Sequence, residues 1–353
     1  MGAPLVVVVF YISGHGFGHA SRDIELVRTI CGRRRDARII VRSTVPRWLF
    51  APADGASVEV QALETDTGLV QIDSLSFDEE KTAREAARFY AEFERRAAIE
   101  AELLAGVRAD LVVGDIPPLA FAAAERAGVP SVALGNFTWD WIYGVYEAFE
   151  RIAPDVIPSI RSAYATATQA LRLPLHGGFE PMSDVTRDIP FIARQSTRDA
   201  ADTRRQLGVG NDRPVVLASF GGYGAQLPAD ALRRSERFTF IEIPREPPPG
   251  LRYQDLVAAA DVVVSKPGYG IVSECVANDT ALLYTSRGRF IEYDLFVEEM
   301  PRILRCKYIS QEDLVAGRWA DAIDALLAQP APPERPAVNG AEVAATEIME
   351  SLC

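Results

Sequence analysis

Two of the three histidines in this 353-residue chain, His15 and His19, lie four residues apart, in the Gly-rich segment Ser13-GHGFGHASR. Histidine is the side chain best suited to proton transfer near neutral pH. The segment follows an apolar run at residues 5–12, so a strand would carry His15 and His19 to the carboxyl edge of a sheet. This pattern predicts a general base, with His19 as the candidate. The alternative is that both imidazoles only bond the backbone.

Polar side chains also follow two later apolar runs. Asp115 comes directly after Leu111-VVG, where its carboxylate would orient an imidazole or else cap a turn or helix. The segment Gly135-NFTWDWIY mixes polar and aromatic residues, which suits a sugar or acceptor surface and suits core packing equally well. We expect His19 and Asp115 to be catalytic. The expected acceptor or cleft residues are His15, Gly16, Asn136 and Asp140.

The C-terminal half has its own Gly-rich segments after apolar runs. Ser219-FGGYG presents N–H groups around Gly221 and Gly222, a concavity suited to phosphate. Lys266-PGYGIVSE leads into a helix whose first amides would hold a pyrophosphate, with Glu274 one turn in to accept ribose hydroxyls. Purely structural glycines and a capping glutamate are the alternative.

Apolar runs alternate with amphipathic stretches in both halves, and residues 79–104 read as one long helix. Alternation of this kind predicts parallel sheets with helices on both faces. Periodicity weakens after residue 174, so we expect an N-terminal Rossmann-like domain at 1–185, a second at 186–339, and a final helix at 340–353 on the first domain. Two facing domains of this type would hold a ligand in the cleft between them.

Composition excludes several classes of protein. The net charge of −12 argues against a nucleic-acid-binding protein. The apolar run at 5–12 is too short to cross a membrane and lacks the features of a signal peptide, so we expect a cytoplasmic protein with no integral membrane segment. Four scattered cysteines without a CxxC pair argue against disulfides and against a structural zinc site.

Several of these segments resemble known glycosyltransferases. Lys266-PGYGIVSEC, following Phe220-GG, is similar to the donor-binding half of GT-B glycosyltransferases of the MurG and MGDG-synthase type. Gly14-HGFGHASR, Asp66-TGLVQIDSLSFD and Gly135-NFTWDWIY resemble the glycosyltransferase-like N-terminal domain of plant L-arabinokinases and its stand-alone bacterial relatives. The likeness covers nearly the whole chain, and it does not imply arabinokinase activity.

The resemblance implies a GT-B fold, a UDP- or dTDP-sugar on the C-terminal domain, a small-molecule or glycan acceptor on the N-terminal domain, and neither a metal nor another cofactor. His19 matches the histidine of the Gly-rich loop, and Glu274 matches the ribose-binding glutamate. The adjacent acid–Gln pair that relatives use to touch the sugar is missing around Arg287 to Tyr293, so the sugar stays open. The expected donor-binding residues are Gly221, Gly222, Lys266, Gly268, Tyr269, Gly270, Glu274, Arg287 and Glu292.

The function expected is therefore metal-independent hexosyl or pentosyl transfer with His19 as general base. Two alternatives are carried with it. One is a non-catalytic sensor that binds sugar nucleotides without turnover. The other is a GT-B-like sugar-nucleotide 2-epimerase, which would need carboxylates clustered about the sugar.

Overall fold

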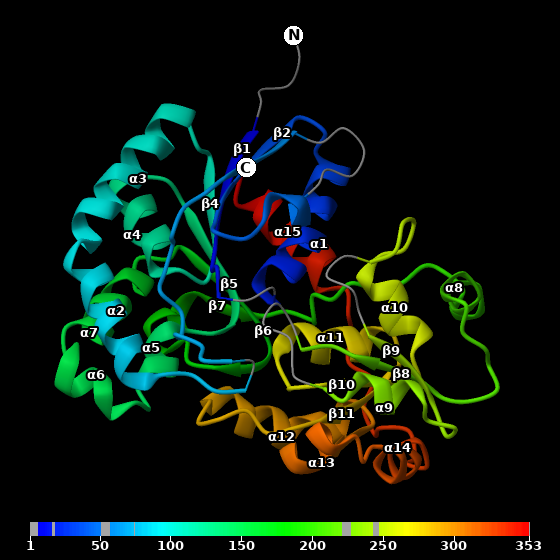
Figure 1. The fold of residues 1–353 in the computed structure, drawn as a ribbon. Helices are drawn as coiled ribbons and strands as arrows, with labels where there is room; N and C mark the ends of the chain where they lie inside the picture. Colours follow the sequence, from blue (N-terminus) through cyan, green and yellow to red (C-terminus); the bar gives the residue numbers. More distant parts are fainter. Residues whose placement is uncertain are drawn as a thin grey trace. The chain divides into compact units, whose positions relative to one another are not determined.

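The computed structural model describes residues 6–15, 18–50, 57–73, 75–220, 227–242 and 247–352. The chain divides into two compact units, which Figure 1 shows as ribbons. Unit 1 comprises Met1–Val70, Asp78–Ile192 and Asn339–Cys353, and unit 2 comprises Gln71–Phe77 and Ala193–Val338. Each unit contains one parallel sheet with helices, which confirms the α/β class predicted from the alternating pattern.

Unit 1 has a seven-stranded parallel sheet in the order β3-β2-β1-β4-β5-β6-β7. Its strands are β1 Val6–Ile12, β2 Ala37–Arg42, β3 Ser57–Gln61, β4 Leu111–Asp115, β5 Ser131–Phe137, β6 Gln169–Gly177 and β7 Thr186–Asp188. The central strands β1 and β4 are buried along nearly their whole length, which explains their uninterrupted apolar sequences. Strand order changes direction between β1 and β4, so the edge beyond their carboxyl ends is where a ligand site is expected.

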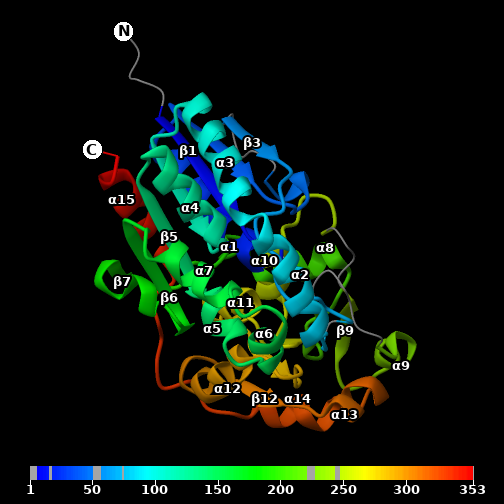
Figure 2. The ribbon, with the colours of Figure 1, turned by 90° about the vertical axis from the view of Figure 1, so that its left-hand side faces the viewer.

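Helices cover both faces of this sheet. They are α1 Gly18–Arg33, η1 Arg47–Phe50, α2 Glu79–Ala91, α3 Phe93–Val107, α4 Pro118–Ala127, α5 Trp139–Tyr143, α6 Glu147–Ile152, α7 Val156–Tyr164, η2 Glu180–Val185 and α15 Gly340–Glu350. In Figure 2, α3, α4 and α7 lie in front of the strands. On the other face α1 packs against the final helix α15, and Arg33 donates hydrogen bonds to Glu342 O and Thr346 Oγ1 at 3.1 and 2.8 Å.

Unit 2 has a five-stranded parallel sheet in the order β12-β11-β10-β8-β9. Its elements are α8 Ala200–Leu207, β8 Val215–Ala218, α9 Ala229–Arg233, β9 Thr239–Glu242, α10 Tyr253–Ala259, β10 Val262–Ser265, α11 Tyr269–Ala277, β11 Ala281–Tyr284, α12 Ile291–Ile303, β12 Cys306–Tyr308, α13 Gln311–Ala316 and α14 Ala320–Leu327. Here the strand order changes direction between β8 and β10. The segments after these two strands are the Gly-rich ones that the sequence assigns to phosphate binding.

The boundary between the units differs from the expected one at residues 185 and 186. Unit 1 continues to Ile192, because β7 pairs with β6 from Ala170↔Thr186 to Arg172↔Asp188 and so extends the first sheet. A strand of three residues between Pro and Gly gives no periodicity that would reveal it. Residues 71–77, expected to belong to the first domain as a polar loop, belong to unit 2.

The long helix expected at residues 79–104 is instead two helices, α2 and α3. The break falls at Glu92, whose φ and ψ are −104° and 6°. Its N–H bonds Phe89 O, three residues back, at 3.2 Å, which tightens the last turn of α2. Residues of high helix propensity on both sides hide such a break in the sequence.

Candidate functional site

The segment after β1 and the ends of β4 and β5 form a buried polar cluster in unit 1. Helix α1 begins at Gly18, so His19 lies in its first turn rather than in the loop, and Arg22 follows on the same helix face. Asp115 is the last residue of β4, and Asn136 lies near the end of β5. His19 is 5% exposed and Arg22 2%, and both Asp115 and Asn136 are fully buried. The structure therefore brings His19, Asp115 and Asn136 together at the switch point.

Asp115 receives three contacts from α1. Arg22 donates from Nε to Oδ2 at 2.6 Å and from Nη2 to Oδ1 at 2.5 Å, and His19 Nδ1 lies 2.8 Å from Oδ1. Burial by itself raises the pKa of Asp115, but the charges and hydrogen bonds of Arg22 and His19 outweigh burial and hold it well below its usual range. Asp115 is therefore an ionised carboxylate with a fixed orientation.

Arg22 is the functional candidate that the sequence reasoning missed. Besides its two bonds to Asp115, it donates from Nη1 to Asn136 Oδ1 at 2.8 Å, so one guanidinium joins the ends of β4 and β5. A buried arginine is stable only when its donors are satisfied. The sequence does offer one indication of its role. Arg22 comes three residues after His19, which places both side chains on the same face of the helix that follows the Gly-rich loop.

The position of the hydrogen on His19 decides what this imidazole can do. Nδ1 lies 2.8 Å from Asp115 Oδ1 and 3.0 Å from Arg22 Nη2. A hydrogen on Nδ1 is donated to the carboxylate and leaves Nε2 as a proton acceptor. Without that hydrogen, Nδ1 accepts from Arg22 and Nε2 becomes a donor. Both of the side-chain hydrogen bonds that His19 makes with the described residues are at Nδ1, and its ring meets Phe137 in a T-shaped contact with centroids 5.4 Å apart.

Asp23, next to Arg22, is a further buried carboxyl in this cluster. Neither of its oxygens has a hydrogen-bond partner among the described residues. Burial and the negative charge of Asp115 raise the pKa of Asp23 well above its usual range. Its surroundings therefore favour the protonated, neutral form of Asp23.

His15 is held differently from His19. Its Nδ1 accepts the N–H of Leu69 at 3.2 Å, which places the ring hydrogen on Nε2 and makes that nitrogen a donor. The neighbouring Gly68 has φ +58°, and a Cβ there would stand 2.6 Å from His15 Nδ1. In this tautomer Nε2 of His15 donates a hydrogen bond and does not take up a proton.

Asp66 links the segment around His15 to β5 and α5. Its carboxylate accepts from Ser13 Oγ at 3.1 Å and from Trp139 Nε1 at 2.8 Å. Burial raises the pKa of Asp66 to about 6, although these bonds and the charge of His19 act in the opposite direction. Asp140, expected to face the cleft, is buried in α5, where Oδ2 accepts from Arg161 Nε at 3.0 Å.

In unit 2, the segment after β10 carries the residues expected to bind the donor. Lys266 follows the strand, and Gly268 is the N-cap of α11. Gly270 lies within α11 rather than in the loop, and Tyr269 is the buried first residue of that helix. The amides at this helix start suit an anion, as the sequence predicts.

Glu274 lies in the second turn of α11, and it has a partner that the sequence did not indicate. Arg194 donates from Nε to Glu274 Oε1 at 2.5 Å, and its guanidinium stands 4.9 Å from the centre of the Tyr253 ring. Tyr253 OH in turn lies 2.6 Å from Ser219 Oγ, directly after β8. This chain of contacts joins Glu274 to the end of β8, one of the two strands at the switch point in unit 2.

Two cations and a buried acid follow β10 and β11. Burial and the charge of Arg287 lower the pKa of Lys266 to about 7. Arg287 lies over the Phe290 ring, 3.9 Å from its centre. Glu292, in the first turn of α12, is 4% exposed. Lys266 is the cation nearest the start of α11 along the chain, so an anion bound there would meet both a charge and helix amides.

Gly16, Gly221 and Gly222 lie outside the described residues. Among the residues that the structure does describe, no three His, Cys, Asp or Glu side chains stand close enough to bind a metal. Within the same residues, no helix combines the length and the apolar character needed to cross a membrane.

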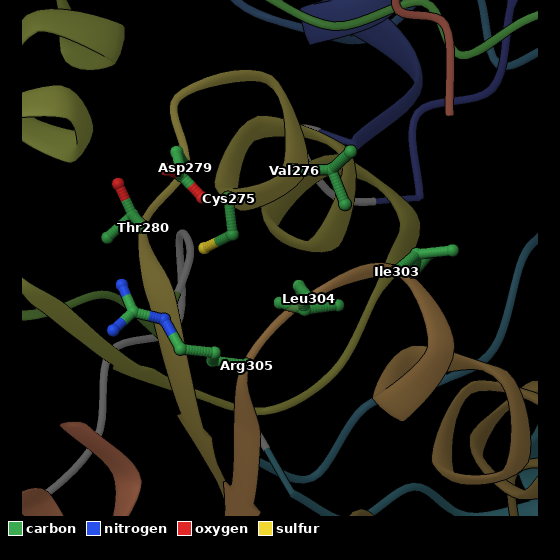
Figure 3. Close-up of a pocket in the computed structure, with 7 residues that line it drawn as sticks. All are labelled: Cys275, Val276, Asp279, Thr280, Ile303, Leu304 and Arg305. Carbon is green, nitrogen blue, oxygen red and sulfur yellow. The ribbon is translucent and has the colours of Figure 1, made fainter. Parts of the chain in front are cut away.

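A small pocket in unit 2 lies at the C-terminal end of α11 (Figure 3). Cys275, Val276, Asp279 and Thr280 line it from the end of α11 and the following turn. Tyr269 begins the same helix at its other end, about 9 Å from Cys275 at 1.5 Å per residue. The pocket is therefore separate from the start of α11, where the sequence predicts an anion site. Its remaining lining residues are Ile303, Leu304 and Arg305.

Sequence comparison relates the chain to two kinds of curated protein, although no protein-family model matches it. L-arabinokinase of Arabidopsis thaliana is 29% identical over 368 residues, which cover 98% of this chain and 34% of that protein. A UDP-N-acetylglucosamine–N-acetylmuramyl-(pentapeptide) pyrophosphoryl-undecaprenol N-acetylglucosamine transferase of Clavibacter sepedonicus is 29% identical over 227 residues, 56% of this chain and 57% of that protein. The chain thus spans about a third and just over half of these relatives.

Solved structures extend the likeness over the whole chain. The glycotransferase of kitacinnamycin has a TM-score of 0.61 and 16% identity, covering 100% of both chains. MurG of Acinetobacter baumannii has a TM-score of 0.53 and 12% identity, covering 98% of this chain and 100% of that one. These neighbours are GT-B glycosyltransferases, which confirms the fold expected from the motifs. The chain therefore has the GT-B fold, and its sequence resembles both L-arabinokinase and the MurG-type transferases.

Proposed function

We propose that this chain is a glycosyltransferase that moves a sugar from a UDP- or dTDP-sugar to a hydroxyl of a small-molecule or glycan acceptor. The observation that carries the proposal is the 2.8 Å contact between His19 Nδ1 and Asp115 at the switch point of a GT-B protein. In this proposal unit 1 binds the acceptor and unit 2 binds the donor. The names of the fold neighbours support the reaction class.

His19 acts as the general base in the proposed step. With its Nδ1 hydrogen donated to Asp115, Nε2 takes the proton of the acceptor hydroxyl as that oxygen bonds the anomeric carbon of the sugar. The bond from this carbon to the diphosphate oxygen breaks, and the diphosphate leaves with the electron pair. Arg22 fixes Asp115 through two bonds, so the carboxylate keeps one oxygen directed at His19. Arg22 is a positioning residue in this scheme.

The leaving diphosphate needs positive charge, which unit 2 provides after β10 and β11. We assign its binding to the first amides of α11 together with Lys266 and Arg287, so that these groups rather than a metal offset the developing charge. Because the pKa of Lys266 is about 7, an arriving diphosphate would draw a proton onto this amine. Glu274, oriented by Arg194, is assigned to the ribose hydroxyls.

One observation favours the sensor as a second candidate. His19 is only 5% exposed, so its imidazole could serve a purely structural purpose by hydrogen-bonding the buried Asp115. A protein with this arrangement would bind the sugar nucleotide and turn it over at no measurable rate. The two candidates share the donor site and differ only in chemistry.

The test measures binding and turnover of the same ligand. UDP, dTDP and their glucose, galactose and N-acetylglucosamine derivatives are screened by thermal unfolding, since a ligand of the folded state raises the Tm. Slow release of UDP or dTDP from the best binder without acceptor supports the transferase. Binding without release supports the sensor, and no Tm shift with any of them contradicts both.

A further inference from the structure

Residues 71–77 belong to unit 2, although the chain on both sides of them belongs to unit 1. An antiparallel bridge between Gln71 and Phe77 closes them into a tight loop, and Ile72 N–H bonds Ser76 O at 3.0 Å. We call these residues the 71–77 loop. Its sequence gives no sign of this placement, because it reads as one polar stretch between β3 and α2.

The 71–77 loop packs against the residues that follow β11. Leu75 packs against the core of unit 2, which includes Val264 of β10 and Leu283 of β11. The Phe77 ring meets Phe290 edge-on, with centroids 6.4 Å apart. A Cβ placed on Gly288 would stand 3.2 Å from Leu75 O, so the two backbones approach closely. The loop is thus part of the edge that carries Lys266 and Arg287.

Asp73 lies in this loop with an exposed carboxylate. Its Oδ1 accepts the N–H groups of Leu75 and Ser76 at 2.7 and 2.8 Å, and these bonds hold the side chain in place. The side chain of Ser76 also hydrogen-bonds this carboxylate. These backbone bonds and the charge of Lys266 lower the pKa of Asp73, so Asp73 is ionised and lies within electrostatic reach of Lys266.

A carboxylate next to a diphosphate site would repel phosphate oxygens, but it accepts hydrogen bonds from hydroxyls. In a sugar nucleotide the group attached to the far phosphate is the sugar, so the hydroxyls nearest the diphosphate belong to it. Glu292 was expected to touch this sugar, yet it is almost fully buried. Asp73, by contrast, is exposed, and its charge acts on Lys266.

We propose that Asp73 accepts hydrogen bonds from hydroxyls of the donor sugar and that the 71–77 loop thereby helps select the sugar. This inference rests on the proposed function, because it takes the diphosphate to lie at Lys266 and α11.

The test substitutes Asp73→Asn, because an asparagine Oδ1 still accepts the bonds from Leu75 and Ser76 and only the charge is lost. Calorimetry compares UDP with the tightest binding UDP-sugar of the panel above. We expect the affinity for the UDP-sugar to fall about ten- to a hundredfold, while UDP binds as tightly as before or several-fold more tightly. Asp78→Asn is the matched control, since Asp78 caps α2 of unit 1 by accepting Lys81 N–H at 2.8 Å.

If Asp73→Asn keeps the wild-type ratio of the two affinities, the inference is wrong while the proposed function stands. If wild-type protein binds neither UDP nor a UDP-sugar, the proposed function fails, and the inference fails with it. A loss of both affinities to the same extent also overturns the inference, because it places Asp73 at the diphosphate rather than at the sugar.

Discussion

The residue with the most contacts in the unit 1 site is an arginine rather than a histidine. Arg22 bonds both oxygens of Asp115 and reaches Asn136, so its charge offsets that of the carboxylate next to His19. A lone aspartate would stabilise an imidazolium more strongly than this paired one does. We infer that the main effect of Asp115 on His19 is to orient the ring and to hold its tautomer.

Arg22→Met should destabilise the protein by about 3–5 kcal/mol, because it leaves the Asp115 charge buried without a partner. Adding Asp115→Leu should restore a substantial part of that loss, since the double variant buries no charge. Urea denaturation of the two single variants and the double variant measures the coupling. Additive effects of the two substitutions would show that the pair does not interact as described.

Asp66 makes stability depend on pH. Its pKa is about 6 in the folded protein against 3.8 for the free side chain, so between these values the folded state binds more protons. The free energy of unfolding therefore falls as pH rises through this window. Above pH 6, the buried Asp66 carboxylate lowers it by about 3 kcal/mol. Asp66→Asn can keep both bonds, by accepting from Trp139 and donating to Ser13. We expect it to gain stability over wild type between pH 4 and 6, and a pH-independent difference would contradict the assignment.

At the scale of elements, the strand–loop–helix unit of β1 and α1 creates the site. It carries His15 and His19 to the edge where β4 ends in Asp115, and both elements follow directly from the apolar run and the helical spacing in the sequence. The contacts of Arg22 and Arg194 could not be predicted in this way. They join residues 93 and 80 positions apart, and periodicity carries no information about such pairs.

The backbone at Gly68 positions His15 from another element. Its φ of +58° disfavours any side chain, and a Cβ would also collide with the imidazole. Gly128 has a similar φ of +66° with nothing within 4 Å of a Cβ, so Gly128→Ala measures the cost of the conformation alone. We expect Gly68→Ala to be the more destabilising of the two in thermal unfolding. Equal losses of stability would mean that His15 is not held against Gly68.

At the scale of the whole molecule, the sequence pattern predicts two α/β halves, and both sheets are present. The division between them was predicted less well. Unit 1 extends to Ile192 because the three-residue strand β7 belongs to its sheet. The 71–77 loop belongs to unit 2, where Leu75 and Phe77 make apolar contacts that a mostly polar stretch of sequence does not predict. The groups assigned to the donor all lie in unit 2, whereas His19 and Asp115 lie in unit 1. Donor binding and proton transfer should therefore be separable by mutation.

We propose that His19 acts as the general base in the transfer of a sugar from a donor that other residues bind. The most direct measurement is UDP release from a bound UDP-sugar by wild-type protein and by His19→Ala, with donor affinity and thermal unfolding recorded for both. A general base contributes on the order of 10²–10⁴ in rate, so His19→Ala should lose at least a hundredfold in release while its donor Kd stays within about twofold of wild type. His19→Gln, which keeps a donor for Asp115, provides a second variant if alanine unfolds the site. Release at the wild-type rate from either folded variant would contradict the account.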